Sequence, residues 1–266
     1  MAAKNLAIAD NELSELLSHY SLIYLKQYWP ELPDSPVGWA DNAVLMLAYQ
    51  EAALAVQRHF KGRPLRMLDV STGPALAPLL AMATCVSEVQ LSDYYGDNRR
   101  CLQNMPIEYW KNYVPMLIKI FNHPEKKATE ILALLDKLRS ARVPVEVDLF
   151  RDPPFPVSVK PHEYELISMQ FVADAITENE KDFLRCLGRI TDMVAPGSAF
   201  IMSAAVDCSS WQLGQFAQPS PNISEKTIVD FLASQNFEIL NLSRSMRHAG
   251  LAYSGGWIVL SALRSK

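Results

Sequence analysis

Lysine and arginine form no long run in this sequence of 266 residues, and the formal net charge is −4. Because a nucleic-acid surface needs clustered cations to neutralise phosphates, nucleic acid is not expected as the main partner. No apolar run approaches the roughly 18 residues of a membrane span. The first residues lack a long apolar core and carry acids early, which argues against a secretory signal. We therefore expect a cytoplasmic protein without a membrane partner.

Cysteine and histidine are scarce as well. The four cysteines, Cys85, Cys101, Cys186 and Cys208, form no CxxC pair and no metal-ligand pattern. No two of the five histidines have metal-ligand spacing. The sequence therefore predicts reduced thiols and no bound metal.

Apolar residues make up 49% of the chain, and this content is enough for a sizeable core. Strand-like segments alternate with helical ones along most of the sequence. Seven strands are expected, at 65–70, 88–95, 143–150, 164–176, 195–206, 237–246 and 255–264. This alternation predicts an α/β fold with an open, mostly parallel sheet flanked by helices on both faces.

The helical segments suggest a division of the chain. Residues 1–60 contain helical patterns at 10–29 and 39–59, and we expect them to form an N-terminal cap or lid. Residues 61–266 would form the sheet domain, with a helix at 74–83. A helical stretch at 107–140 is longer than an ordinary crossover and therefore looks like an insertion.

Polar residues follow several predicted strands where each one ends. They are Asp69 to Gly73, Asp93 to Asn98, Asp148, and Gln170 to Asp174. In open α/β sheets ligands bind outside the carboxyl ends of the strands. The sequence thus predicts one binding site along this edge.

The turn after the first strand, in "LDVSTGPALAPLL", carries a single glycine, Gly73. A dinucleotide cradle needs more glycines, and Pro74 removes one backbone donor from the turn. Asp69 would also repel a diphosphate, whereas Asp93, at the end of the next strand, suits ribose hydroxyls. A cationic nucleoside without phosphate, such as S-adenosylmethionine, fits this turn better than NAD does. An ordinary polar strand end with a capping serine is the simpler alternative.

Three motifs together carry a family resemblance. "LDVSTGPALAPLL", "SDYYGDN" and "YLKQYW", residues 24–29, resemble signatures of the nicotinamide/phenylethanolamine/thioether N-methyltransferase family. Weaker similarity extends over most of the chain. The resemblance implies a Rossmann-like class I methyltransferase fold with an N-terminal helical lid and a helical insertion. It also implies S-adenosyl-L-methionine as cofactor and S-adenosyl-L-homocysteine as product.

The resemblance also implies roles for residues that match the family motifs. Ser71 stands where the family usually has glycine, Trp29 where it has tyrosine, and Ser203 where it has an acid. The implied cofactor-binding residues are Tyr24, Tyr28, Trp29, Asp69, Ser71, Gly73, Pro74, Asp93, Tyr94, Asn98, Asp148, Leu149, Gln170 and Phe171.

Asp174 and Tyr24 are the candidate catalytic residues, with Asp174 as proton acceptor. The candidate substrate-binding residues are Tyr24, Asp174, Asp207, Trp211, His248 and Tyr253. Simpler readings stay open: Tyr24 could belong to a core-facing helical stripe, Asp174 could cap a helix, and Asp207 and Trp211 could lie on a surface loop.

We therefore expect a monomer that N-methylates a small amine or nitrogen heterocycle by in-line transfer. An O- or S-methyltransferase of the same fold and a catalytically silent cofactor-binding protein are the alternatives.

Overall fold

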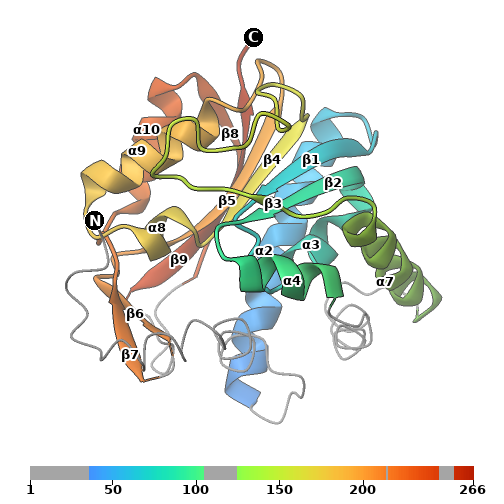
Figure 1. Cartoon of the computed structure of the whole chain (residues 1–266), viewed down its shortest axis with the longest axis horizontal. Coiled ribbons are helices and arrows are strands. Elements are labelled where there is room, and N and C mark those ends of the chain that lie inside the picture. Colours follow the sequence, from blue (N-terminus) through green and yellow to red (C-terminus); the bar gives the residue numbers. More distant parts are fainter. Residues whose placement is uncertain (1–35, 105–124, 214, 246–254) are drawn as a thin grey trace.

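The computed structural model describes residues 36–104, 125–213, 215–245 and 255–266 (Figure 1). Within them, seven strands form one sheet in the order β3-β2-β1-β4-β5-β9-β8. The strands are β1 (Leu65–Val70), β2 (Val86–Asp93), β3 (Val145–Glu146), β4 (Leu166–Gln170), β5 (Ala199–Val206), β8 (Phe237–Arg244) and β9 (Gly256–Arg264). β1 to β5 pair in parallel, and β9 runs antiparallel between β5 and β8. The predicted mostly parallel sheet is confirmed.

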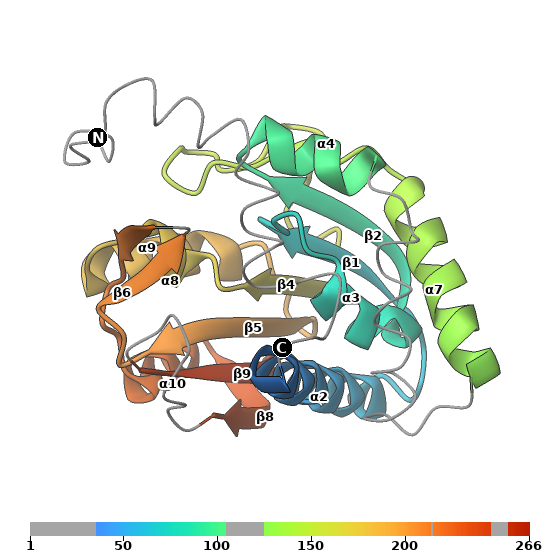
Figure 2. The same ribbon diagram turned by 90° about the horizontal axis from the view of Figure 1, so that it is seen from below.

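Helices cover both faces of this sheet, as the view in Figure 2 shows. One layer contains α2 (Pro36–His59), α3 (Ala77–Met82), the short helix η1 (Ala83–Cys85) and α7 (Glu125–Ser140), with α4 (Gly96–Asn104) beside β2. The other contains α8 (Ala173–Ile176), α9 (Glu180–Thr191) and α10 (Glu225–Ser234). No helix of the described chain is long and apolar enough to cross a membrane.

The two layers bury separate apolar clusters against the sheet. Every residue of β5 is buried, as expected for a central strand covered on both faces. Side-chain caps define where two outer helices begin: Asn179 accepts from the Asp182 amide before α9, and Ser224 from the Thr227 amide before α10. These helices and strands fix the carboxyl edge of β1, β2, β4 and β5, where the sequence predicts the site.

Three predicted elements are shorter than expected. The strand predicted at 164–176 ends at Gln170 because Phe171 has a positive φ of 53°, and α8 then follows. The helix predicted at 74–83 begins only at Ala77, since residues 71–74 form a turn. The strand predicted at 143–150 is reduced to the two residues of β3.

A two-stranded hairpin was not predicted. It comprises β6 (Ser210–Leu213) and β7 (Phe216–Pro219) and follows β5. The predicted lid helix at 10–29 lies outside the described residues, and of the predicted insertion only α7 is described. The division at residue 60 stays a prediction, although α2 packs against β8, β9 and α3.

Candidate cofactor and substrate site

The turn between β1 and α3 is anchored to the end of β2. The Ser71 amide donates to Ser92 Oγ over 3.2 Å, and the Thr72 amide donates to the Ser92 carbonyl over 2.7 Å. Ser71 and Gly73 both have positive φ values, of 51° and 65°. A Cβ built on Gly73 has no heavy atom of the described residues within 4 Å. Gly73 therefore presents an open backbone face, while Pro74 behind it is buried.

Asp93 ties this turn to the start of α4. Its carboxylate accepts hydrogen bonds from the Gly73 amide (2.8 Å), the Tyr95 amide (2.8 Å) and Asn98 Nδ2 (3.0 Å). Only 3% of Asp93 is exposed, and this burial raises its pKa, partly offset by the three donors and the Arg99 guanidinium. Asp93 thus organises two of the loops at the sheet edge.

Asp69 lies one residue before the end of β1 and is buried. Ser168, its cross-strand neighbour on β4, donates a hydrogen bond to Asp69 Oδ1. Burial raises the pKa of Asp69 to about 6, against the lowering effect of hydrogen bonds from Ser168 and Thr72. Its carboxyl group is held within the sheet by Ser168, and it therefore braces β1 against β4.

At the end of β4 the chain leaves the sheet abruptly. The Phe171 amide donates to the Ser203 carbonyl over 3.0 Å. The side-chain amide of Gln170 is among the groups that lower the pKa of Asp69, and so this side chain lies near that acid. Both of its polar atoms are nevertheless buried without a hydrogen-bond partner in the described part of the chain. Unpaired buried polar atoms are costly and mark a place where a ligand could bind.

Asp174 follows on α8 and is only 2% exposed. Its Oδ2 accepts from the Ala205 amide over 2.9 Å, whereas its Oδ1 is buried with no partner among the described residues. Burial raises the pKa of this carboxyl to about 7. A buried acid with this pKa and one unpaired oxygen can exchange a proton near neutral pH.

Three further predicted cofactor residues lie at the ends of β2 and β3. Tyr94 is 53% exposed and contacts Tyr95 edge-to-face. Asp148 caps its own loop, since Oδ1 accepts from the Phe150 amide over 2.9 Å. Leu149 is buried in the apolar cluster under α9, and its carbonyl accepts from the Arg189 guanidinium over 2.6 Å, so the protein already engages both its side chain and its carbonyl.

The two candidate substrate-binding residues that follow β5 both make polar contacts with neighbouring elements. Asp207 forms an ion pair with Arg244 of β8 over 2.9 Å. Trp211, on β6, donates from its indole to the Ala175 carbonyl over 3.3 Å. The hairpin thereby packs beside α8, which carries Asp174.

Five predicted residues, Tyr24, Tyr28, Trp29, His248 and Tyr253, lie outside the described residues, and their roles stay predictions. The sequence reading missed Ser168 and Tyr49, which are buried partners of Asp69 and Ser203. Nothing in the sequence distinguishes them from core residues, because their partners come from distant segments.

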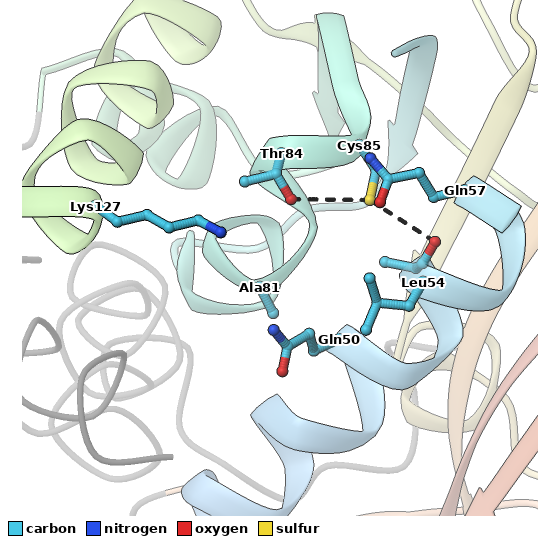
Figure 3. Close-up of a pocket in the computed structure, with 8 residues that line it drawn as sticks. Gln50, Leu54, Gln57, Ala81, Thr84, Cys85 and Lys127 are labelled. Carbon is cyan, nitrogen blue, oxygen red and sulfur yellow. Dashed lines mark hydrogen bonds between the residues drawn. The ribbon is translucent and has the colours of Figure 1, made fainter. Parts of the chain in front are cut away.

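Neither a metal-binding cluster nor the detected hollow points to a different location for the candidate site. No group of three or more metal-ligating side chains occurs in the described ranges. A hollow of about 190 Å³ opens between α2, α3, η1 and α7, lined by Gln50, Gln57, Thr84 and Lys127 among others (Figure 3). Thr84 and Cys85 immediately precede β2, and the hollow therefore lies away from the carboxyl edge.

A comparison with family models matches residues 21–264 to the NNMT/PNMT/TEMT family. No curated protein sequence matches the chain. Among solved structures, magnesium protoporphyrin IX methyltransferase from Synechocystis PCC 6803, with bound SAM, has a TM-score of 0.55 at 14% identity, covering 98% of this chain and 100% of that one. The N-methyltransferase NodS from Bradyrhizobium japonicum, with S-adenosyl-L-homocysteine, has a TM-score of 0.50 at 10% identity, covering 94% and 99%. These structural likenesses concern the fold.

Proposed function

The chain belongs to the NNMT/PNMT/TEMT family of S-adenosylmethionine-dependent methyltransferases, and from this premise we propose that it methylates a nitrogen atom of a small amine or nitrogen heterocycle. The family name and the fold do not distinguish nitrogen from oxygen or sulfur as the acceptor atom. The observation that carries the proposal is the Asp174 carboxyl group, with its one unpaired buried oxygen beside the end of β4.

The residues at the strand ends fit the cofactor. A carboxylate offers about four lone-pair positions, and Asp93 uses three of them for protein donors. The remaining position suits one ribose hydroxyl, and Gly73 leaves the neighbouring space open. Asn98, Tyr94 and the Gln170 amide are further candidates to line the cofactor.

When bound, S-adenosylmethionine supplies an electrophilic methyl group. The protein has to align the acceptor nitrogen and keep water away. An alkylammonium acceptor must first lose a proton, and Asp174 Oδ1 is the proposed acceptor for it. Ala205 holds the other carboxyl oxygen in place. A neutral nitrogen heterocycle would not need this step.

The test is a methyl-transfer assay with purified protein and labelled S-adenosylmethionine. The acceptor panel contains alkylamines, nitrogen heterocycles, phenols and thiols. Transfer to an amine or heterocycle, but not to phenols or thiols, is expected. Transfer only to oxygen or sulfur would refute the choice of nitrogen. Cofactor binding without transfer to any acceptor would favour the catalytically silent alternative.

Asp174→Asn provides the second arm of the assay. The asparagine oxygen can still accept from the Ala205 amide, but the side chain cannot take up a proton. With an alkylamine acceptor we expect kcat to fall by about 100-fold or more, and the wild-type rate to rise with pH through about 7 as Asp174 ionises. Asp192→Asn, at the end of α9, is the matched control. An unchanged kcat in Asp174→Asn would remove Asp174 from the mechanism.

A further inference from the structure

The helix α8, which carries Asp174, is a single turn of four residues, Ala173–Ile176. A helix this short is not stable by itself, because its first turn fixes several residues for few hydrogen bonds. Val172 at its N-cap is apolar and offers no side-chain oxygen to the first amides of the helix. The position of the Asp174 carboxyl group therefore depends on contacts that other elements make with α8.

Both β5 and the hairpin hold α8 by hydrogen bonds. The Ala205 amide of β5 donates to Asp174 Oδ2 over 2.9 Å, and the Trp211 indole of β6 donates to the Ala175 carbonyl over 3.3 Å. The Ala175 carbonyl lies in the last turn of α8, where carbonyl groups have no partner inside the helix. Asp174 and Ala175 are consecutive residues, and the two bonds therefore hold neighbouring points of the same turn.

The Trp211 side chain is committed to this contact. An indole ring has one polar hydrogen, so the bond to Ala175 uses the only donor that the side chain has. Only 7% of Trp211 is exposed, and the hairpin lies beside α8 (Figure 2). Trp211 and Leu213 alternate with less buried residues and thus share the buried face of β6. An acceptor molecule could therefore meet the ring of Trp211 but not its N–H group.

We propose that Trp211 is a positioning residue, whose indole N–H group fixes the last turn of α8 and so keeps Asp174 Oδ1 in the place from which it removes the proton. The inference rests on the proposed function, because it takes Asp174 as the proton acceptor. A general base has to lie within hydrogen-bonding reach of the proton, and a displacement of about 1 Å can cost much of the rate. Loss of the indole donor should therefore slow proton removal without weakening acceptor binding.

The first test is amide hydrogen exchange of the cofactor-free full chain, followed by NMR. Trp211→Phe keeps an aromatic ring and removes the indole donor. Because α8 then holds the Asp174 carboxyl less firmly, the Ala205 amide should exchange about three- to tenfold faster, the effect of one weakened hydrogen bond. Leu213→Ala, the matched control, removes apolar contacts from the same face of β6 and should leave this rate unchanged. Wild-type exchange in Trp211→Phe, or equal acceleration in both variants, would overturn the inference.

The wild-type protein offers the same test without a variant. If the indole bond holds α8, one local opening releases both the Trp211 indole N–H and the Ala205 amide. Their protection against exchange should then agree within about threefold. An indole N–H that exchanges freely while the Ala205 amide stays protected would overturn the inference.

Kinetics with the best alkylamine of the acceptor panel give the functional test. In Trp211→Phe we expect kcat to fall about three- to tenfold, while KM for the amine stays within about twofold of wild type. A direct contact between Trp211 and the substrate predicts the opposite, a raised KM at unchanged kcat, and this result would overturn the inference. If no alkylamine is methylated, the proposed function fails, whereas hydrogen exchange still shows whether Trp211 holds α8.

Discussion

At the scale of single residues, Asp93 has the most connections in the site. Three donors from the β1 turn and from the segment that starts α4 converge on its carboxylate. We expect Asp93→Ala to weaken S-adenosylmethionine binding by at least about tenfold, because it removes a charged acceptor and loosens both loops. Isothermal titration calorimetry measures this change.

The matched control for Asp93 is Asp97→Ala on α4. Asp97 forms a surface ion pair with Arg100, and such pairs contribute little to stability. We expect this variant to bind the cofactor as wild type does. Equal affinity of Asp93→Ala and wild type would contradict the assignment of Asp93 to the cofactor site.

The raised pKa of Asp174 leads to a prediction of how the free energy of unfolding depends on pH. Its pKa of about 7 in the folded protein exceeds the ordinary value of 3.8. Between about pH 4 and pH 7 the folded state therefore binds more protons than the unfolded chain, and the free energy of unfolding falls as pH rises. Asp69, with a pKa of about 6, adds to this slope at its lower end.

Removing the Asp174 carboxyl group should flatten this pH dependence. Asp174→Asn is expected to be more stable than wild type at pH 8, by on the order of a few kcal/mol at most. Urea unfolding of the cofactor-free protein at several pH values between 5 and 8 measures it. Parallel curves for the two proteins would show that Asp174 ionises as an exposed acid does.

At the scale of elements, the turn between β1 and α3 is the part of the backbone that we propose contacts the cofactor. Gly73 has a φ of 65° and open space where a Cβ would lie, and Gly62, in the turn before β1, has a φ of 77° and similar space. Alanine at either position strains the backbone without a clash and should lower the free energy of unfolding by about 1 kcal/mol. Chemical denaturation measures this shared cost.

Only one of the two glycines, Gly73, lies in the turn that we propose binds the cofactor. Gly73→Ala should weaken S-adenosylhomocysteine binding by about tenfold or more, because the methyl group fills the backbone's open face. Gly62→Ala, far from the carboxyl edge, should leave the affinity unchanged. If both variants bind equally well, the cofactor does not approach this turn.

At the scale of the whole molecule, cofactor binding should stabilise the fold by mass action. At a hundredfold excess over Kd the gain is about 2.7 kcal/mol, which for a chain of this size corresponds to a rise in Tm of about 5 °C or more. Differential scanning fluorimetry should show this rise with S-adenosylhomocysteine and none with NAD. An equal rise with NAD would indicate that the turn after β1 binds a dinucleotide.

Much of the architecture was predictable because it depends on local pattern. The predicted strand at 65–70 matches β1, and the polar residues that end β1, β2 and β4 share one edge because parallel strands end together. The wrongly predicted ends of elements have local causes that the hydrophobic pattern does not indicate. Phe171 ends β4 through a positive φ that sequence rules do not expect for a bulky residue.

The sequence by itself determined the parallel sheet and, through its motifs, the family and the cofactor, while the binding edge stays a prediction. Only the tertiary structure decided which polar groups are paired. Asp69 is held by Ser168, and Ser203 by Tyr49, while Gln170 and one oxygen of Asp174 have no partner in the described chain. Hydrogen bonding and burial depend on distances between segments far apart in sequence, and the pKa of a buried acid depends on both.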